Sequence, residues 1–198
     1  EIQRLNRGFK SLPPQVGRAM ILQELLGIRI SDTLTLKSDC VIRKADGSLF
    51  IHIHQPKVNR SFEKPISKEV LSLIESSINY TTSLYGKCEY IFVCDKNPNH
   101  PMKYSMLHYH LSCMIHDLDL RDDNGNLFGV STHIFRHVYG KRLCDMGLDD
   151  STIAALLGHS GTSSVKHYRQ MGNKALAQGT KQLRANKDAK IKQFKEEW

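Results

Sequence analysis

Residues 131–171 read STHIFRHVYGKRLCDMGLDDSTIAALLGHSGTSSVKHYRQM and combine helical spacing of apolar residues with a small set of reactive side chains. They contain His133-Ile134-Phe135-Arg136, then Leu156-Leu157-Gly158-His159, and then Tyr168 nine residues after that histidine. An arginine fork binds two phosphate oxygens at once and stays charged at any working pH, and a histidine can carry a proton near neutrality. The stretch therefore predicts helices that carry a phosphodiester-binding site, with Tyr168 as the nucleophile.

A zinc site is the main alternative for this stretch. His133 and His137 lie four residues apart and would share one helix face, as in the zinc motif H-E-x-x-H. Here no glutamate base intervenes, and the guanidinium of Arg136 beside a cation site would repel the metal. We therefore reject zinc and pair His133 with Arg136, three residues further along the same face. No metal or other cofactor is expected.

Composition limits the class of protein. The chain has 198 residues, 40% of them hydrophobic, which predicts a globular fold with a substantial core. Its net charge of +8 favours a polyanionic partner such as nucleic acid. Five cysteines without a C-x-x-C pair favour reduced thiols, and no run approaches the roughly 18 apolar residues of a membrane helix. We therefore expect a cytoplasmic protein that has no membrane partner.

Two short helices are predicted near the N-terminus. Pro13-Pro14 suits the first turn of a helix that Gly27 ends, and a second short helix begins after it. Arg29 lies at the junction, where on its own it would be interpreted as an ordinary surface arginine. Residues 1–11 are polar and basic, and the chain opens at Glu1 without a methionine. We therefore expect residues 1–11 to be a linker or arm from an upstream DNA-binding domain.

Short strands follow from residue 39. Residues 40–43 and 49–54 flank Asp46-Gly47, a hairpin turn signal, and residues 61–66 form a third strand. Lys57 lies at the tip of the second hairpin, a place where most lysines are simply solvated. Helical patterns occupy most of the remaining chain. The sequence thus predicts an α+β fold that is mostly helical, with a small three-stranded antiparallel sheet on one side.

The combination of motifs resembles the catalytic domain of the tyrosine recombinases, the phage integrase family. The arginine motif of that family corresponds to residues Gly27-Ile28-Arg29-Ile30-Ser31-Asp32-Thr33-Leu34, with aspartate in place of glutamate. Its hairpin lysine, followed eight residues later by a proline, corresponds to Lys57 and Pro65. Its H-x-L-R-H-T motif corresponds to residues 133–138, and its L-L-G-H…Y motif to residues 156–168. The resemblance extends from about Pro13 to Met171.

The resemblance implies the fold of that family and a DNA strand transfer in two steps. Tyr168 would attack a DNA phosphate to give a 3′-phosphotyrosyl intermediate and a free 5′-hydroxyl, and a partner 5′-hydroxyl would then rejoin the strand. Neither ATP nor metal is required, because the ester keeps the bond energy. The implied catalytic residues are Arg29, Lys57, His133, Arg136, His159 and Tyr168.

The resemblance also implies a role for each residue. Arg29, Arg136 and His159 would clamp the phosphate, and His133 would act in proton transfer at the tyrosine. Lys57 would protonate the leaving 5′-oxygen.

The departures from the family pattern are local. Phe135 replaces the usual leucine, and Val138-Tyr139-Gly140 replaces the usual Thr-Phe-Ala, which changes packing but not the charged groups. The hairpin region is a few residues longer than in compact family members. Lys64 is the alternative to Lys57, but its neighbour Pro65 places it within the third strand.

We expect residues 12–172 to form the catalytic domain and residues 173–198 a basic amphipathic helix. The expected function is site-specific recombination of double-stranded DNA for integration or excision of a mobile element. The protein would act as a homo-oligomer, a tetramer on DNA, with the C-terminal helix packed either on its own protomer or on a neighbour. A type IB topoisomerase and a DNA-binding module with a decayed site remain the alternatives.

Overall fold

The computed structural model describes residues 2–129 and 131–170, and the chain divides into two compact units, residues 1–139 and 140–198. The first unit contains the main hydrophobic core and the sheet. The second unit begins within helix α6 (His133–Asp145). The amphipathic helix expected at residues 173–198 lies outside the described residues.

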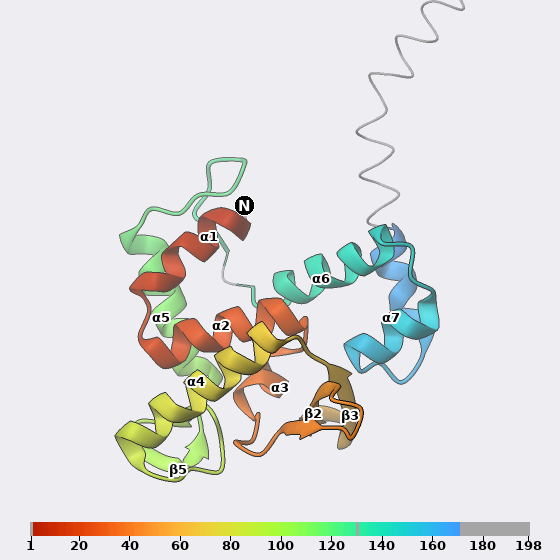
Figure 1. The fold of residues 1–198 in the computed structure, drawn as a ribbon. Helices are drawn as coiled ribbons and strands as arrows, with labels where there is room; N and C mark the ends of the chain where they lie inside the picture. The colour runs from red at the N-terminus through yellow and green to blue at the C-terminus, as the bar shows by residue number, and fades with distance from the viewer. Residues whose placement is uncertain (1, 130, 171–198) are drawn as a thin grey trace, which may run out of the picture. The chain divides into compact units, whose positions relative to one another are not determined.

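Helices make up most of the regular secondary structure of the first unit (Figure 1). Helix α2 begins at Pro14, because proline suits the first helical position, and ends before Gly27, whose left-handed φ of 62° closes the helix. Ser67 caps α4 by accepting a hydrogen bond from the backbone N–H of Val70. Besides the start of α6 and a short helix within the sheet, this unit contains α1 (Ile2–Gly8), η1 (Phe9–Ser11), α2 (Pro14–Leu26), α3 (Ile30–Leu34), α4 (Lys68–Tyr85) and α5 (Tyr104–Asp117).

The three-stranded antiparallel sheet is present as predicted, in the order β1-β2-β3. It consists of β1 (Val41–Arg43), β2 (Leu49–Gln55) and β3 (Arg60–Pro65), with the short helix η2 (Pro56–Val58) between the last two. Ile51 and Ile53 of β2 are fully buried, whereas the alternate residues His52 and His54 are exposed. This alternation places one face of the sheet on the core and leaves the other face open.

Two segments differ from the sequence-based expectation. Residues 2–11, expected to be a linker or arm, form α1 and η1, and their side chains Leu5 and Phe9 are buried in the core. Residues 97–101 look like a loop in the sequence but form strand β5 (Asn97–Pro101), which pairs with β4 (Val93–Cys94). The first segment depends on contacts with a distant part of the chain, since α1 contacts α5, whereas β5 pairs with β4 in a local hairpin.

The described part of the second unit is helical. Asp149 caps α7 (Asp150–Leu157) by accepting from the backbone N–H of Thr152 at 2.9 Å, and Gly158 ends the helix in a left-handed conformation. The helical turn η3 (Thr162–Ser164) leads into residues 165–170, which are also helical. Across both described segments of the chain, no helix is long and apolar enough to span a membrane.

Candidate active site

The C-terminal end of α2 gathers three cationic side chains. Arg136 of α6 donates from Nη1 to the carbonyl oxygen of Gly27 at 3.0 Å, and Lys64 of β3 donates from Nζ to that of Leu26 at 2.6 Å. Arg29 follows at the start of α3. The last carbonyls of a helix lack partners within the helix and lie at the negative end of its dipole, so they favour cations. We call Arg29, Lys64 and Arg136 the basic cluster.

A buried carboxylate holds Arg29 within this cluster. Asp32 Oδ2 lies 3.7 Å from Arg29 Nη1 and accepts a hydrogen bond from Gln55 Nε2 at 3.3 Å. Burial raises the pKa of the Asp32 carboxyl, and the nearby guanidinium groups of Arg29 and Arg136 act in the opposite direction. Two arginines that are far apart in the sequence thus lie within electrostatic reach of one carboxylate.

Gly27 is required by two features of this junction. Its φ of +62° is left-handed, and a Cβ built on it would lie 2.3 Å from Cγ of Tyr139. We expect Gly27→Ala to lower the free energy of unfolding by about 3 kcal/mol, since left-handed strain adds to a steric clash. Denaturant titration of the purified variant measures the loss.

Gly47→Ala is the matched control for this prediction. Gly47 also has a left-handed φ, of +82°, but a Cβ there would meet nothing within 4 Å. This variant should therefore lose only the strain component, about 1 kcal/mol. Equal losses in the two variants would show that Tyr139 does not restrict the junction.

The two candidate lysines of the hairpin occupy different environments. Lys57 lies in η2 at the tip, exposed, with no hydrogen bond or ion pair to any described residue. Lys64 is only 2% exposed, and its Nζ lies 4.1 Å from the ring centroid of Tyr139. The structure therefore places Lys64, and not Lys57, beside Arg136 at the end of α2. Lys64 follows the half-buried Phe62 by two residues in β3. Residues two apart in a strand point to the same face of the sheet, so this spacing is the signal in the sequence that places Lys64 on the inner face.

His133 begins α6 and is exposed. Its ring centroid lies 6.3 Å from that of His137, one helical turn further on. Arg136 follows His133 by three residues, so both project from neighbouring positions of the same helix. Among the residues that the structure describes, no group of three or more His, Cys, Asp or Glu side chains could hold a metal ion.

Tyr168 and His159 are neighbours in the second unit. Tyr168 is 5% exposed, and its ring lies nearly parallel to that of His159, with an interplanar angle of 10° and centroids 6.2 Å apart. Gly140 leaves room for the tyrosine, since a Cβ there would lie 3.0 Å from Cγ of Tyr168. The spacing of nine residues between His159 and Tyr168 thus brings the two rings together.

The helical segment that carries Tyr168 is attached to the start of α7. Arg169 donates from Nε to Asp150 Oδ1 at 2.5 Å and from Nη2 to the carbonyl oxygen of Leu148 at 2.7 Å. Because Arg169 is the next residue after Tyr168, these two bonds restrict where the tyrosine backbone can lie. Sequence reasoning did not single out Arg169.

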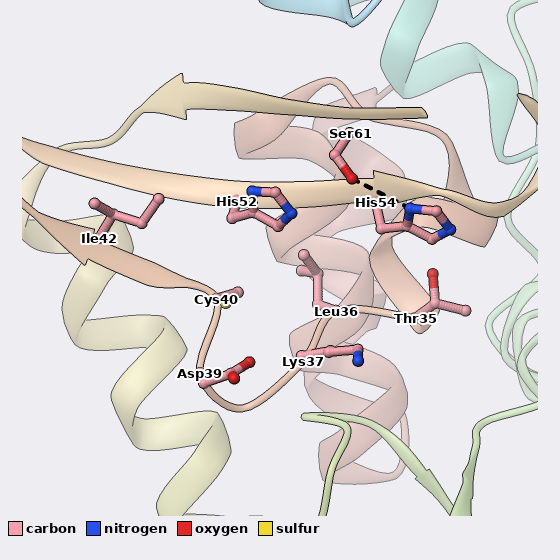
Figure 2. A pocket seen from close by; sticks show the side chains of 9 residues that line it. All are labelled: Thr35, Leu36, Lys37, Asp39, Cys40, Ile42, His52, His54 and Ser61. Atoms are coloured by element: carbon pink, nitrogen blue, oxygen red, sulfur yellow. Dashed lines mark hydrogen bonds between the residues drawn. The ribbon is translucent and has the colours of Figure 1, made fainter. Parts of the chain in front are cut away.

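A pocket of about 540 Å³ opens on the outer face of the sheet (Figure 2). His52 and His54 project into it from β2, and His54 Nδ1 lies 3.2 Å from Ser61 Oγ. Lys64 pairs with Ile51 across the strands and shares the opposite, inner face with it. None of the predicted catalytic residues lines this pocket.

Known proteins resemble the chain in sequence and in fold. Transposase B from transposon Tn554 of Staphylococcus aureus strain Mu50 is 26% identical over 175 residues, which cover 88% of this chain and 28% of that protein. Transposase B from transposon PsiTn554 of Staphylococcus aureus matches with the same identity and coverage. The chain thus spans 28% of the length of these curated relatives.

Solved structures share the fold. The XerH site-specific recombinase bound to palindromic difH substrate superposes with a TM-score of 0.68, at 15% identity, over 90% of this chain and 50% of that one. XerA recombinase also gives a TM-score of 0.68, at 18% identity, over 92% of this chain and 61% of that one. The fold class predicted from the sequence is confirmed.

The sequence model of the phage integrase family matches residues 3–174, which is most of the chain. The family predicted from the arginine, histidine and tyrosine motifs is therefore confirmed, and the chain belongs to the phage integrase family.

Proposed function

We propose that the protein is a site-specific DNA recombinase that integrates or excises a mobile element. Membership of the phage integrase family and the likeness to transposases of Tn554 and PsiTn554 support this function. The observation that carries the proposal is the basic cluster at the end of α2. Two arginines near one buried carboxylate, and a lysine on the adjacent carbonyl of Leu26, form an environment that stabilises an anionic phosphodiester, and the net charge of +8 favours DNA as its source.

The reaction is a pair of transesterifications. The oxygen of Tyr168 attacks the phosphorus, the bond to the 5′-oxygen breaks, and a 3′-phosphotyrosine and a free 5′-hydroxyl result. The proton of the tyrosine passes to a base, and the leaving oxygen takes up a proton. A 5′-hydroxyl of the partner strand then attacks the phosphotyrosine and releases the tyrosine. Because each step exchanges one ester for another, neither ATP nor a metal is needed.

Each predicted residue has a task in this reaction. Arg29, Arg136 and His159 hold the non-bridging oxygens and the negative charge that develops on them. His133 accepts the tyrosine proton, a role that suits histidine near neutral pH. Lys57 protonates the leaving 5′-oxygen, and its exposure at the hairpin tip is consistent with reaching a DNA strand.

The partner is double-stranded DNA, on which the protein assembles as a homo-oligomer, a tetramer. The basic amphipathic sequence of residues 173–198 is the segment proposed to pack on a neighbouring protomer. Recombination needs two DNA sites held together, which a single copy of this domain cannot provide.

Trapping the covalent intermediate tests the function. Full-length protein is incubated with nicked duplexes that tile the junction between the encoding element and its flanking DNA, so that the cleaved end diffuses away and religation fails. We expect a protein–DNA adduct that survives denaturation, and peptide mapping should place the DNA on Tyr168. A gel shift in the same reactions reports binding.

Each outcome of this experiment has a defined meaning. An adduct on Tyr168 together with strand exchange between two sites supports the recombinase. Relaxation of supercoiled DNA without strand exchange supports the type IB topoisomerase. Duplexes that bind but never form an adduct support a DNA-binding module, and an adduct on another tyrosine contradicts the assignment of the nucleophile.

A further inference from the structure

Lys64 is a buried lysine that the proposed reaction leaves without a task. It lies in β3 on the inner face of the sheet and is 2% exposed, a degree of burial that is rare for lysine. Its place beside Arg136 is costly, because a second positive charge is buried there. A role at the phosphate site would account for the position of this residue.

The contacts of Lys64 connect it to Arg136. The Lys64 ammonium donates to the carbonyl oxygen of Leu26, and Arg136 donates to the carbonyl oxygen of the next residue, Gly27. The Lys64 ammonium and the Arg136 guanidinium therefore bind two consecutive backbone carbonyls. Two residues beyond Gly27, the same segment carries Arg29, so a shift of these carbonyls would move both arginines of the site.

The surroundings of Lys64 make its protonation state depend on pH near neutrality. Burial, and to a smaller degree the nearby Arg136, lower the pKa of the Lys64 ammonium to about 7. Arg136 and the Tyr139 phenol face it from α6, the carbonyl of Leu26 faces it from α2, and Ile51 lies opposite it on β2. Near neutral pH the side chain is therefore divided between its charged and its neutral form.

We propose that Lys64 is a positioning residue of the phosphate site, which takes up a proton from solvent when a phosphodiester binds beside Arg136 and then fixes the Leu26–Gly27 carbonyls that hold this arginine. The proposal rests on the proposed function, because the anion is the scissile phosphate. By linkage, an anion that favours the charged lysine binds more tightly when the lysine is already charged. Phosphate binding should therefore weaken as Lys64 loses its proton.

Stability against pH tests the protonation of Lys64 without DNA. In the folded protein the pKa of Lys64 is lowered from 10.5 to about 7. The free-energy cost of burying its charge is therefore at its full value below pH 7 and disappears as the pH rises towards 10.5. Between these values, the unfolding constant of the wild type should fall by up to about tenfold per pH unit relative to Lys64→Met. Denaturant titrations at pH 6 and 9 measure the difference.

Lys44→Met is the matched control. Lys44 also lies over an aromatic ring, with Nζ 3.9 Å from the centroid of Phe50, but its side chain is 44% exposed and is paired with Glu63. This variant should therefore change with pH in parallel with the wild type. If the stability of the wild type changes with pH in parallel with that of Lys64→Met, the proposal is overturned, since Lys64 would then keep its proton in this range.

DNA affinity against pH tests the coupling. Binding of the adduct-forming duplex is measured between pH 6.5 and 8.5 in the Tyr168→Phe background, which prevents cleavage. Relative to Tyr168→Phe/Lys64→Arg, whose charge is permanent, the protein with Lys64 should lose about three- to tenfold in affinity between pH 7 and 8.5. The site histidines are common to both proteins, so the ratio isolates Lys64. If arginine does not fit the site, Lys64→Met should bind more weakly below pH 7 and show the smaller pH dependence.

The outcomes separate this inference from the proposed function. Parallel pH profiles for the proteins with lysine and with its replacement overturn the positioning role, while an adduct on Tyr168 leaves the recombinase function intact. Bound DNA that never yields an adduct overturns the function instead, and the stability experiment still decides whether Lys64 titrates near neutral pH. A merely structural lysine would change affinity equally at every pH.

Discussion

Tyr168→Phe should abolish the covalent adduct with DNA while leaving DNA binding unchanged. The substitution removes one oxygen atom and keeps the ring, which lies nearly parallel to His159 and against Gly140. Without that oxygen no phosphotyrosine can form, whereas the cations that bind DNA remain. Denaturing gels of the nicked-duplex reaction measure the adduct, and gel shifts at the same protein concentration measure binding.

Tyr109→Phe is the matched control for the nucleophile. Tyr109 is 63% exposed on α5, and loss of its hydroxyl should change neither adduct formation nor binding. An adduct that persists in Tyr168→Phe would reject Tyr168 as the nucleophile. Simultaneous loss of binding and adduct in Tyr168→Phe would instead indicate that the hydroxyl is needed to hold the DNA.

Much of the fold was predictable because local chemistry determines where its elements begin and end. Pro14 begins α2 and Gly27 ends it, Ser67 caps α4, and the Asp46-Gly47 turn joins β1 to β2. Each of these residues acts through its own backbone or through a neighbour within a few positions. Signals of this kind are legible in a single sequence.

Long-range packing accounts for the features that the sequence did not predict. In α5 the buried residues are Leu107, Leu111, Met114 and Ile115, whereas the apolar Tyr109 and Leu118 of the same helix region are exposed. Both sides of this helix carry apolar residues, so spacing alone does not decide which side faces the core. The surrounding helices decide it.

The candidate site also has features that the sequence predicts and features that depend on long-range packing. The family resemblance implied that Arg29, Arg136, His159 and Tyr168 act at one phosphate. In the structure both arginines act on the Asp32 carboxyl, and the His159 ring lies beside that of Tyr168, while their roles remain predictions. Lys64 was only the alternative lysine, since nothing near it in the sequence indicates that its ammonium meets the carbonyl of Leu26. Whether Lys57 also acts at the DNA remains a prediction for mutagenesis.

Arg136→Lys should lower the rate of adduct formation by at least about 100-fold, because losing one preorganised donor at a phosphoryl-transfer site has effects of 10²–10³. Nη1 of Arg136 donates to the carbonyl oxygen of Gly27, which fixes the orientation of the planar guanidinium. A lysine is a point charge on a flexible stem and cannot serve both the carbonyl and the phosphate in this fixed geometry. Single-turnover cleavage of the nicked duplex, with protein in excess, measures the rate.

Arg142→Lys provides the control within the same helix. Arg142 is exposed in the last turn of α6, so the substitution keeps the charge and should leave the cleavage rate within about twofold of the wild type, as is usual for surface positions. Arg136→Lys keeps the formal charge as well, and therefore tests geometry and not net charge. A wild-type rate for Arg136→Lys would mean that a single positive charge is sufficient at this position, and the bond to Gly27 would then have no role in cleavage. If Arg136→Lys cleaves slowly while Arg142→Lys cleaves at the wild-type rate, the loss is due to the fixed geometry of the Arg136 guanidinium, which the end of α2 holds in place.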